Sequence, residues 1–114
     1  MNKNATIQFK GKNYDVVFNL NVMQAIQEEY GTLNKWAELT DGSNGEPDAK
    51  AVIFGFREMI NEAIDIQNYE NNEDEPYLTL KQIGRLISEI GFNRATFILN
   101  QKVIESTQSA EKNA

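Results

Sequence analysis

The first third of the chain restricts the fold most, because two short strands lead directly into a helix. Residues 5–10 and 13–18 alternate apolar with polar side chains, the period of half-buried strands. Gly11 and Lys12 between them are typical of a two-residue type II′ turn, which favours glycine at its first position. Counting outward from that turn predicts these cross-strand pairs: Phe9 with Tyr14, Ile7 with Val16, and Ala5 with Phe18. All the apolar side chains then share one face, which must pack on helices because a lone hairpin is marginal in water.

Five helices are predicted after the hairpin, since apolar residues recur at helical spacing between residues that typically begin or end helices. They span residues 21–30, 32–40, 49–68, 79–90 and 93–105. The predicted N-caps are Asn21, Thr32, Thr79 and Asn93, and Gln24 and Gln82 stand at capping-box positions. Residues 41–48 and 69–77 are predicted loops because they are polar and contain glycine, proline or asparagine.

Length and composition favour one soluble unit. The chain has 114 residues, of which 40% are hydrophobic and 25% are charged, as in an ordinary globular domain. We therefore predict an α+β fold, mainly α, with an N-terminal β-hairpin (residues 5–18) packed on a bundle of four to five helices. Residues 1–105 are expected to form a single globular domain, and residues 106–114 a flexible tail.

The residues that usually carry catalysis or bind metals are missing. The chain has no cysteine and no histidine, which removes disulfides, thiolate ligands and the commonest general base. Four carboxylates gather at Glu70, Glu73, Asp74 and Glu75, but without the spacing or the glycine of a calcium loop, so a solvated loop is the better interpretation. We expect no catalytic residue, no metal site, no cofactor and no enzyme activity.

The charge of the chain argues against two classes of partner. Its formal net charge is −6, which repels both a nucleic-acid backbone and an anionic membrane surface. The start of the chain has no apolar stretch like that of a signal peptide, and no apolar run is long enough to cross a bilayer. We expect an intracellular protein that binds neither nucleic acid nor membrane.

Three apolar residues stand on the wrong side of their predicted helices. Phe54 lies about 160° from the centre of the apolar stripe of its helix. Phe97 and Ile104 form a second stripe on the last helix, away from Ala95 and Leu99. Such residues either meet a second layer of the same domain, such as the hairpin, or bind a partner or a second copy. Phe54, Phe97 and Ile104 are therefore the candidate protein-binding residues.

The order of these features resembles a known family. The strand, glycine turn and strand lead into NLNVMQAIQEEYGTLNKWAEL, and the long helix AVIFGFREMINEAI and the segment LTLKQIGRL follow. This order is similar to that of the small tail assembly chaperones of long-tailed phages and prophages of Gram-positive bacteria. The resemblance extends from about Thr6 to Glu105, and it is the order of the motifs, more than any single motif, that carries it.

The resemblance implies a non-enzymatic role in the host bacterial cytoplasm. Such chaperones bind the long tape measure protein and help to recruit tail tube proteins around it, and many exist in a short and a frameshifted longer form. Two alternatives stay open. One is a small acidic regulator that inhibits a basic partner, whose binding would weaken steeply with salt. The other is a minor structural protein of the virion.

Overall fold

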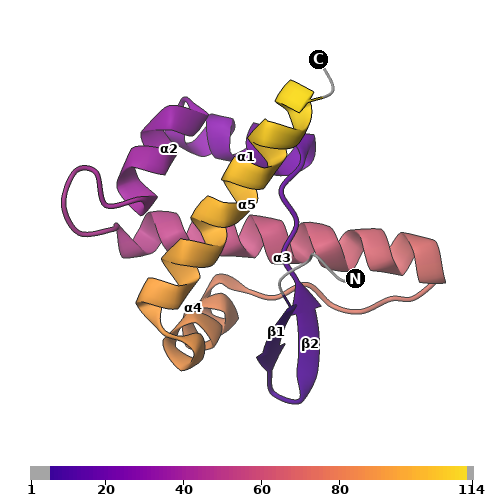
Figure 1. The fold of residues 1–114 in the computed structure, drawn as a ribbon. Helices are drawn as coiled ribbons and strands as arrows, with labels where there is room; N and C mark the ends of the chain where they lie inside the picture. The colour runs from indigo at the N-terminus through magenta and orange to yellow at the C-terminus, as the bar shows by residue number, and fades with distance from the viewer. Residues whose placement is uncertain (1–5, 113–114) are drawn as a thin grey trace.

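The computed structural model describes residues 6–112 of the chain, and the side chains of residues 6–107. Within these residues it contains a two-stranded antiparallel hairpin followed by five helices (Figure 1). The elements are β1 (Thr6–Phe9), β2 (Lys12–Asp15), α1 (Leu20–Tyr30), α2 (Leu33–Thr40), α3 (Ala49–Asn71), α4 (Leu80–Ile90) and α5 (Phe92–Lys112). The predicted class, α+β and mainly α, is confirmed.

Helix α3 is the centre of the fold. Helices α1, α2, α4 and α5 and strand β2 all contact it, and α5 crosses it in Figure 1. A helix of 23 residues is about 35 Å long, so α3 reaches across most of the molecule. Its buried residues include six apolar side chains that recur at helical spacing in the sequence: Val52, Phe56, Met59, Ile60, Ala63 and Ile64. Five of these six, all except Ala63, belong to one core cluster, and both strands and all five helices contribute side chains to it or pack against it.

The hairpin forms in a different register from the predicted one. The observed pairs are Thr6 with Asp15, Ile7 with Tyr14, Gln8 with Asn13, and Phe9 with Lys12. The turn residues are Lys10 and Gly11, with φ angles of 53° and 77°, as a type I′ turn requires at both central positions. Because side chains alternate with a period of two, a shift of two residues leaves the same side chains on the buried face, so the apolar pattern could not separate the registers. The predicted pair involving Ala5 lies outside the described residues.

Two predicted N-caps are wrong. Helix α1 is capped by Asn19, whose side chain accepts a hydrogen bond from the backbone N–H of Val22 at 3.2 Å, whereas Asn21 lies inside the helix. Two asparagines two residues apart have the same capping propensity, and the tertiary structure selects the one whose backbone is extended. Helix α5 begins at Phe92, directly after Gly91, which places Asn93 inside its first turn.

The caps of α2 and α4 agree with the prediction. The Thr32 side chain accepts from the backbone N–H of Lys35 at 3.0 Å. In α4, the hydroxyl of Thr79 accepts from the N–H of Gln82 at 3.2 Å, while the Gln82 side chain accepts from the N–H of Thr79 at 2.8 Å. This reciprocal capping box satisfies two backbone donors that the first helical turn would otherwise leave unpaired.

Two helices are longer than predicted. Helix α3 continues to Asn71 and ends at Asn72, which takes a left-handed conformation. Helix α5 continues to Lys112, although the prediction ended it at residue 105. Residues 106–112 contain no glycine and no proline, so nothing in the local sequence stops the helix. The flexibility predicted for residues 106–114 stays a prediction, and residues 113–114 lie outside the described part of the chain.

Helix α2 approaches α3 closely because α3 has a glycine at the contact. The indole ring of Trp36 is fully buried, and its N–H donates to the backbone carbonyl of Ala51 at 3.0 Å. A β-carbon added to Gly55 would lie 2.5 Å from Cζ2 of Trp36, closer than real contacts allow. The absence of a side chain at Gly55 therefore makes room for the ring of Trp36 against α3.

The segment between α3 and α4 is bound along α3 rather than being a free loop. The side-chain amide of Asn61 donates to the carbonyl of Leu78 at 3.0 Å and accepts from its N–H at 2.9 Å. Asn68 makes the same pair of bonds with Glu75, both at 3.0 Å. Each side-chain amide thus pairs with both the N–H and the carbonyl of one residue, as the backbone of a neighbouring β-strand does. Together they direct the chain back beside α3 and into α4 (Figure 1).

Candidate functional site

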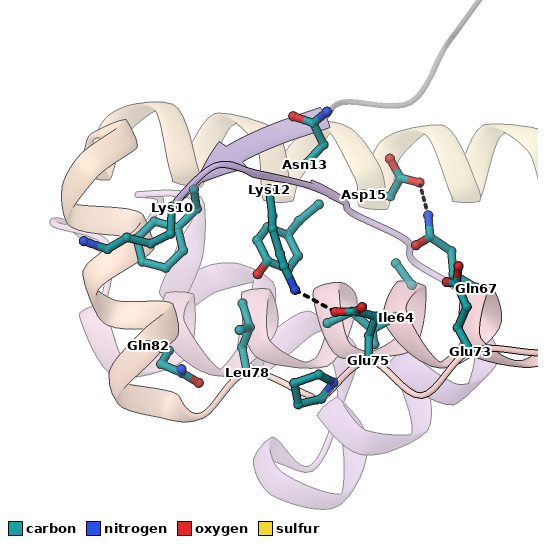
Figure 2. Close-up of a pocket in the computed structure, with 14 residues that line it drawn as sticks. Lys10, Lys12, Asn13, Asp15, Ile64, Gln67, Glu73, Glu75, Leu78 and Gln82 are labelled. Atoms are coloured by element: carbon teal, nitrogen blue, oxygen red, sulfur yellow. Dashed lines mark hydrogen bonds and ion pairs between the residues drawn. The ribbon is translucent and has the colours of Figure 1, made fainter. Parts of the chain in front are cut away.

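A hollow of about 490 Å³ lies between the hairpin, α3 and the segment that leads into α4 (Figure 2). Lys12 Nζ donates to a carboxylate oxygen of Glu75 at 2.7 Å, and Gln67 Nε2 donates to Asp15 Oδ2 at 3.3 Å. The hydrogen bond that Lys12 donates to Glu75 raises the pKa of Lys12 above its usual value. These polar groups bind one another across the hollow, so we interpret it as a junction that joins the hairpin to the helices.

The acidic residues that precede α4 are exposed to solvent, as predicted for a solvated segment: Glu70, Glu73, Asp74 and Glu75. Among the side chains that the structure describes, no three histidine, cysteine, aspartate or glutamate residues gather where they could hold a metal ion. None of the described helices is long and apolar enough to cross a membrane.

Phe54 is partly covered by helix α1 rather than by the hairpin. Its ring meets the ring of Tyr30 edge to face, with a centroid distance of 5.5 Å. The guanidinium of Arg57 lies 5.4 Å from the centroid of the same ring. Both contacts are favourable arrangements for an aromatic ring. A second layer of the same domain therefore meets Phe54, although α1 and not the hairpin supplies it, and the side chain remains partly exposed.

The ring of Tyr30 makes this contact, and its hydroxyl is buried. Burial is the main cause that raises the pKa of Tyr30 above its usual value of 10.0. The hydroxyl has no hydrogen-bond partner among the described residues. Tyr30 therefore acts here mainly as an aromatic surface that packs on Phe54.

Phe97 and Ile104 lie together on the exposed face of α5. Phe97 is 62% exposed and Ile104 is 47% exposed. They are one heptad apart on a face opposite the buried Ala95 and Leu99. We name this pair the α5 stripe. Of the three candidate residues, helical periodicity brings only Phe97 and Ile104 onto one surface. Phe54 lies on α3, and its aromatic neighbour, Tyr30, belongs to α1.

Several further large apolar side chains are exposed, although the sequence pattern does not predict it. Helical spacing places Leu80 on the same face of α4 as the buried Ile83 and Ile87, yet Leu80 is 48% exposed. Leu80 is the first residue after the N-cap Thr79. It therefore lies at the end of the helix, where no preceding helical turn covers it. Leu20, Tyr69, Tyr77 and Phe92 are also exposed. The hydroxyl of Tyr77 donates to Asp65 at 2.6 Å, which raises the pKa of Tyr77.

Leu80 and Phe54 meet in one groove. Between α3 and α4 lies an open groove of about 690 Å³, whose apolar lining residues are Ile53, Phe54, Leu80 and Gly84. A β-carbon added to Gly84 would lie 3.8 Å from Cδ1 of Ile53, an ordinary contact distance. A methyl group at position 84 would therefore fit against Ile53 without a clash.

No known protein family, curated protein or solved structure matches this chain. Two apolar surfaces stand out among the described side chains. They are the α5 stripe and the groove between α3 and α4.

Proposed function

We propose that this protein is a non-enzymatic tail assembly chaperone of a long-tailed phage or prophage, acting in the host bacterial cytoplasm. In this role it binds the tape measure protein and helps to recruit tail tube subunits. The sequence resemblance supports the proposal through the order of its elements. They are a hairpin, a short helix that ends before Gly31, a helix around Trp36, a long apolar helix and a helix capped by Thr79.

The observation that carries the proposal is the α5 stripe. Single exposed apolar residues are common on protein surfaces. Here two large ones are one heptad apart and face away from the core, with the uncharged Asn100 and Gln101 between them. Apolar residues at this spacing can pack along the stripe of another helix. A tape measure protein, as the resemblance describes it, is a long helical chain with such stripes.

The size of the stripe fits a reversible contact. Fully burying a phenylalanine or isoleucine side chain stabilises by about 1.5–3 kcal/mol. Because Phe97 and Ile104 are already about half covered, each would contribute about 1–2 kcal/mol when a partner covers it. Two such contacts add binding energy without making the complex irreversible, as is required of a chaperone that leaves before the virion is complete.

The test is an affinity pull-down of tagged full-length protein from an induced lysogen or infected host that carries the gene, read by mass spectrometry. We expect a very long, helix-rich phage protein, recovered together with tail tube subunits. The double variant Phe97→Asn with Ile104→Asn should lose that protein. Both side chains are exposed, so its melting temperature should stay close to that of the wild type.

The control variant is Tyr69→Ser, which removes another exposed aromatic side chain, but from α3. It should retain the long phage protein. Recovery of a small basic host protein that salt releases would instead favour the acidic regulator. Stable presence in purified virions would favour a structural component. Unfolding of the double variant would mean that the α5 stripe belongs to the core.

A further inference from the structure

The groove between α3 and α4 extends over several helical turns. Its lining on α3 runs from Lys50 through Phe54 and Arg57, and a second hollow that shares Arg57, Leu80 and Lys81 continues it to Asn61 and Tyr77. Residues 50–61 of α3 cover about 17 Å of helix axis, or three turns. The groove is therefore long enough for a helical segment of about eleven residues.

The lining of the groove has the opposite charge to the protein as a whole. The chain has a formal net charge of −6. The groove is nevertheless lined by Lys50, Arg57 and Lys81, with Glu29 at one end and Glu58 towards the other. Glu58 is already bound to Arg57 at 2.9 Å. Among the described side chains, Lys50 and Lys81 have no carboxylate within 4.0 Å, so both can bind an incoming one.

We propose that this groove binds an acidic amphipathic helix of a partner protein. The apolar face of that helix would contact Ile53, Phe54 and Leu80, and its flanking carboxylates would bind Lys50 and Lys81. The inference deepens the proposed function, because it adds a second binding surface to the α5 stripe and names the kind of segment that would bind there. It rests on that function only for the identity of the partner.

A second copy of this chain fits the groove less well. The exposed apolar face of its own α5 has Asn100 and Gln101 between Phe97 and Ile104, so it offers amides rather than carboxylates at those positions. The net charge of −6 also opposes close approach of two copies. Charge complementarity therefore favours an acidic helix from another protein.

The test selects binders to the full-length protein from a displayed library of 14-residue helices. Each helix has leucine at three positions, i, i+4 and i+7, and the flanking positions vary among glutamate, lysine, glutamine and serine. We expect glutamate to be enriched at the flanking positions. The affinity of a selected peptide should fall roughly tenfold for the double variant Lys50→Glu with Lys81→Glu, and should fall with added salt. A peptide with lysine in place of glutamate should restore binding to that variant.

A matched control changes two exposed lysines outside the groove, Lys10→Glu with Lys35→Glu, and should bind the selected peptide with unchanged affinity. The variant Leu80→Ser should weaken binding without reversing the charge preference. Failure to select any binder, enrichment of lysine, or equal binding by the two double variants would overturn the proposal. So would a change in oligomeric state as the sole effect of the groove variants. Selection of acidic peptides without recovery of a tape measure protein would support the groove and overturn the proposed partner.

Discussion

Replacing Gly55 with alanine should destabilise the protein, because of how closely α2 packs on α3. The new methyl group would lie 2.5 Å from Cζ2 and 3.2 Å from Cε2 of Trp36. The ring cannot easily move away, since it is fully buried and its N–H donates to the carbonyl of Ala51. Relief of the clash therefore requires α2 to move away from α3, or the ring to leave its hydrogen bond.

Three effects set the magnitude. Overpacking a core by one methyl group typically costs about 1–3 kcal/mol. Loss of the indole hydrogen bond would add about 1 kcal/mol. Alanine is the better helix former, which offsets about 1 kcal/mol of this cost. The free energy of unfolding should therefore fall by about 1–3 kcal/mol, which corresponds to a decrease in melting temperature of roughly 4–15 °C for a domain of this size.

The assay is thermal and urea unfolding followed by circular dichroism, with tryptophan fluorescence reporting on the only tryptophan, Trp36. The matched control is Gly84→Ala, also inside a helix. Its added β-carbon would meet Ile53 Cδ1 at an ordinary 3.8 Å. With no clash, helix propensity alone should stabilise this variant by up to about 1 kcal/mol.

The two glycine variants should thus have opposite signs. If Gly55→Ala were as stable as the wild type, or gained the stability expected for the Gly84→Ala control, the close approach of Trp36 to α3 would be refuted. An unchanged fluorescence spectrum in a destabilised Gly55→Ala variant would also contradict it, because the clash must displace the indole ring or the helix that carries it.

Four further results are expected. Asn61→Ala should lower the free energy of unfolding by about 1–3 kcal/mol, because it leaves a partly buried backbone donor and acceptor unpaired, and denaturant unfolding measures this loss. Tyr30→Phe should be neutral or stabilising by up to about 1 kcal/mol, since it removes a buried hydroxyl that has no partner among the described residues, and a destabilised variant would contradict this. Thr79→Ala should cost about 1 kcal/mol and increase amide exchange in the first turn of α4. The pKa of Asp41 should lie below its usual value of 3.8, because Ser43 donates hydrogen bonds to its carboxylate. The ionised Asp41 therefore stabilises the fold above pH 3.8, and this stabilisation is lost as the pH falls through the lowered pKa. NMR titration should show the Asp41 pKa rising in Ser43→Ala.

The predicted fold agrees with the structure where the signal is local. The caps at Thr32 and Thr79 and the six-residue buried stripe of α3 follow from residue type and helical spacing, which the local sequence contains. The exposure of Phe97 and Ile104 follows in the same way, since a helix can bury only one face. The errors arise where local preferences are equal, as between the two asparagines at the start of α1 and between two hairpin registers with the same alternation.

The sequence alone determined the class of fold, most of the helices and which face of α5 stays exposed, because periodicity and capping act within a few residues of each other. It did not determine which helix would cover Phe54 or why position 55 requires glycine. Nor did it determine that Leu80 would line a groove with Lys50 and Lys81. Those features depend on contacts between residues distant in the chain, such as the bonds from Asn61 and Asn68 that direct the chain back along α3. Only the tertiary structure brings such residues together, because packing and charge act through space rather than along the sequence.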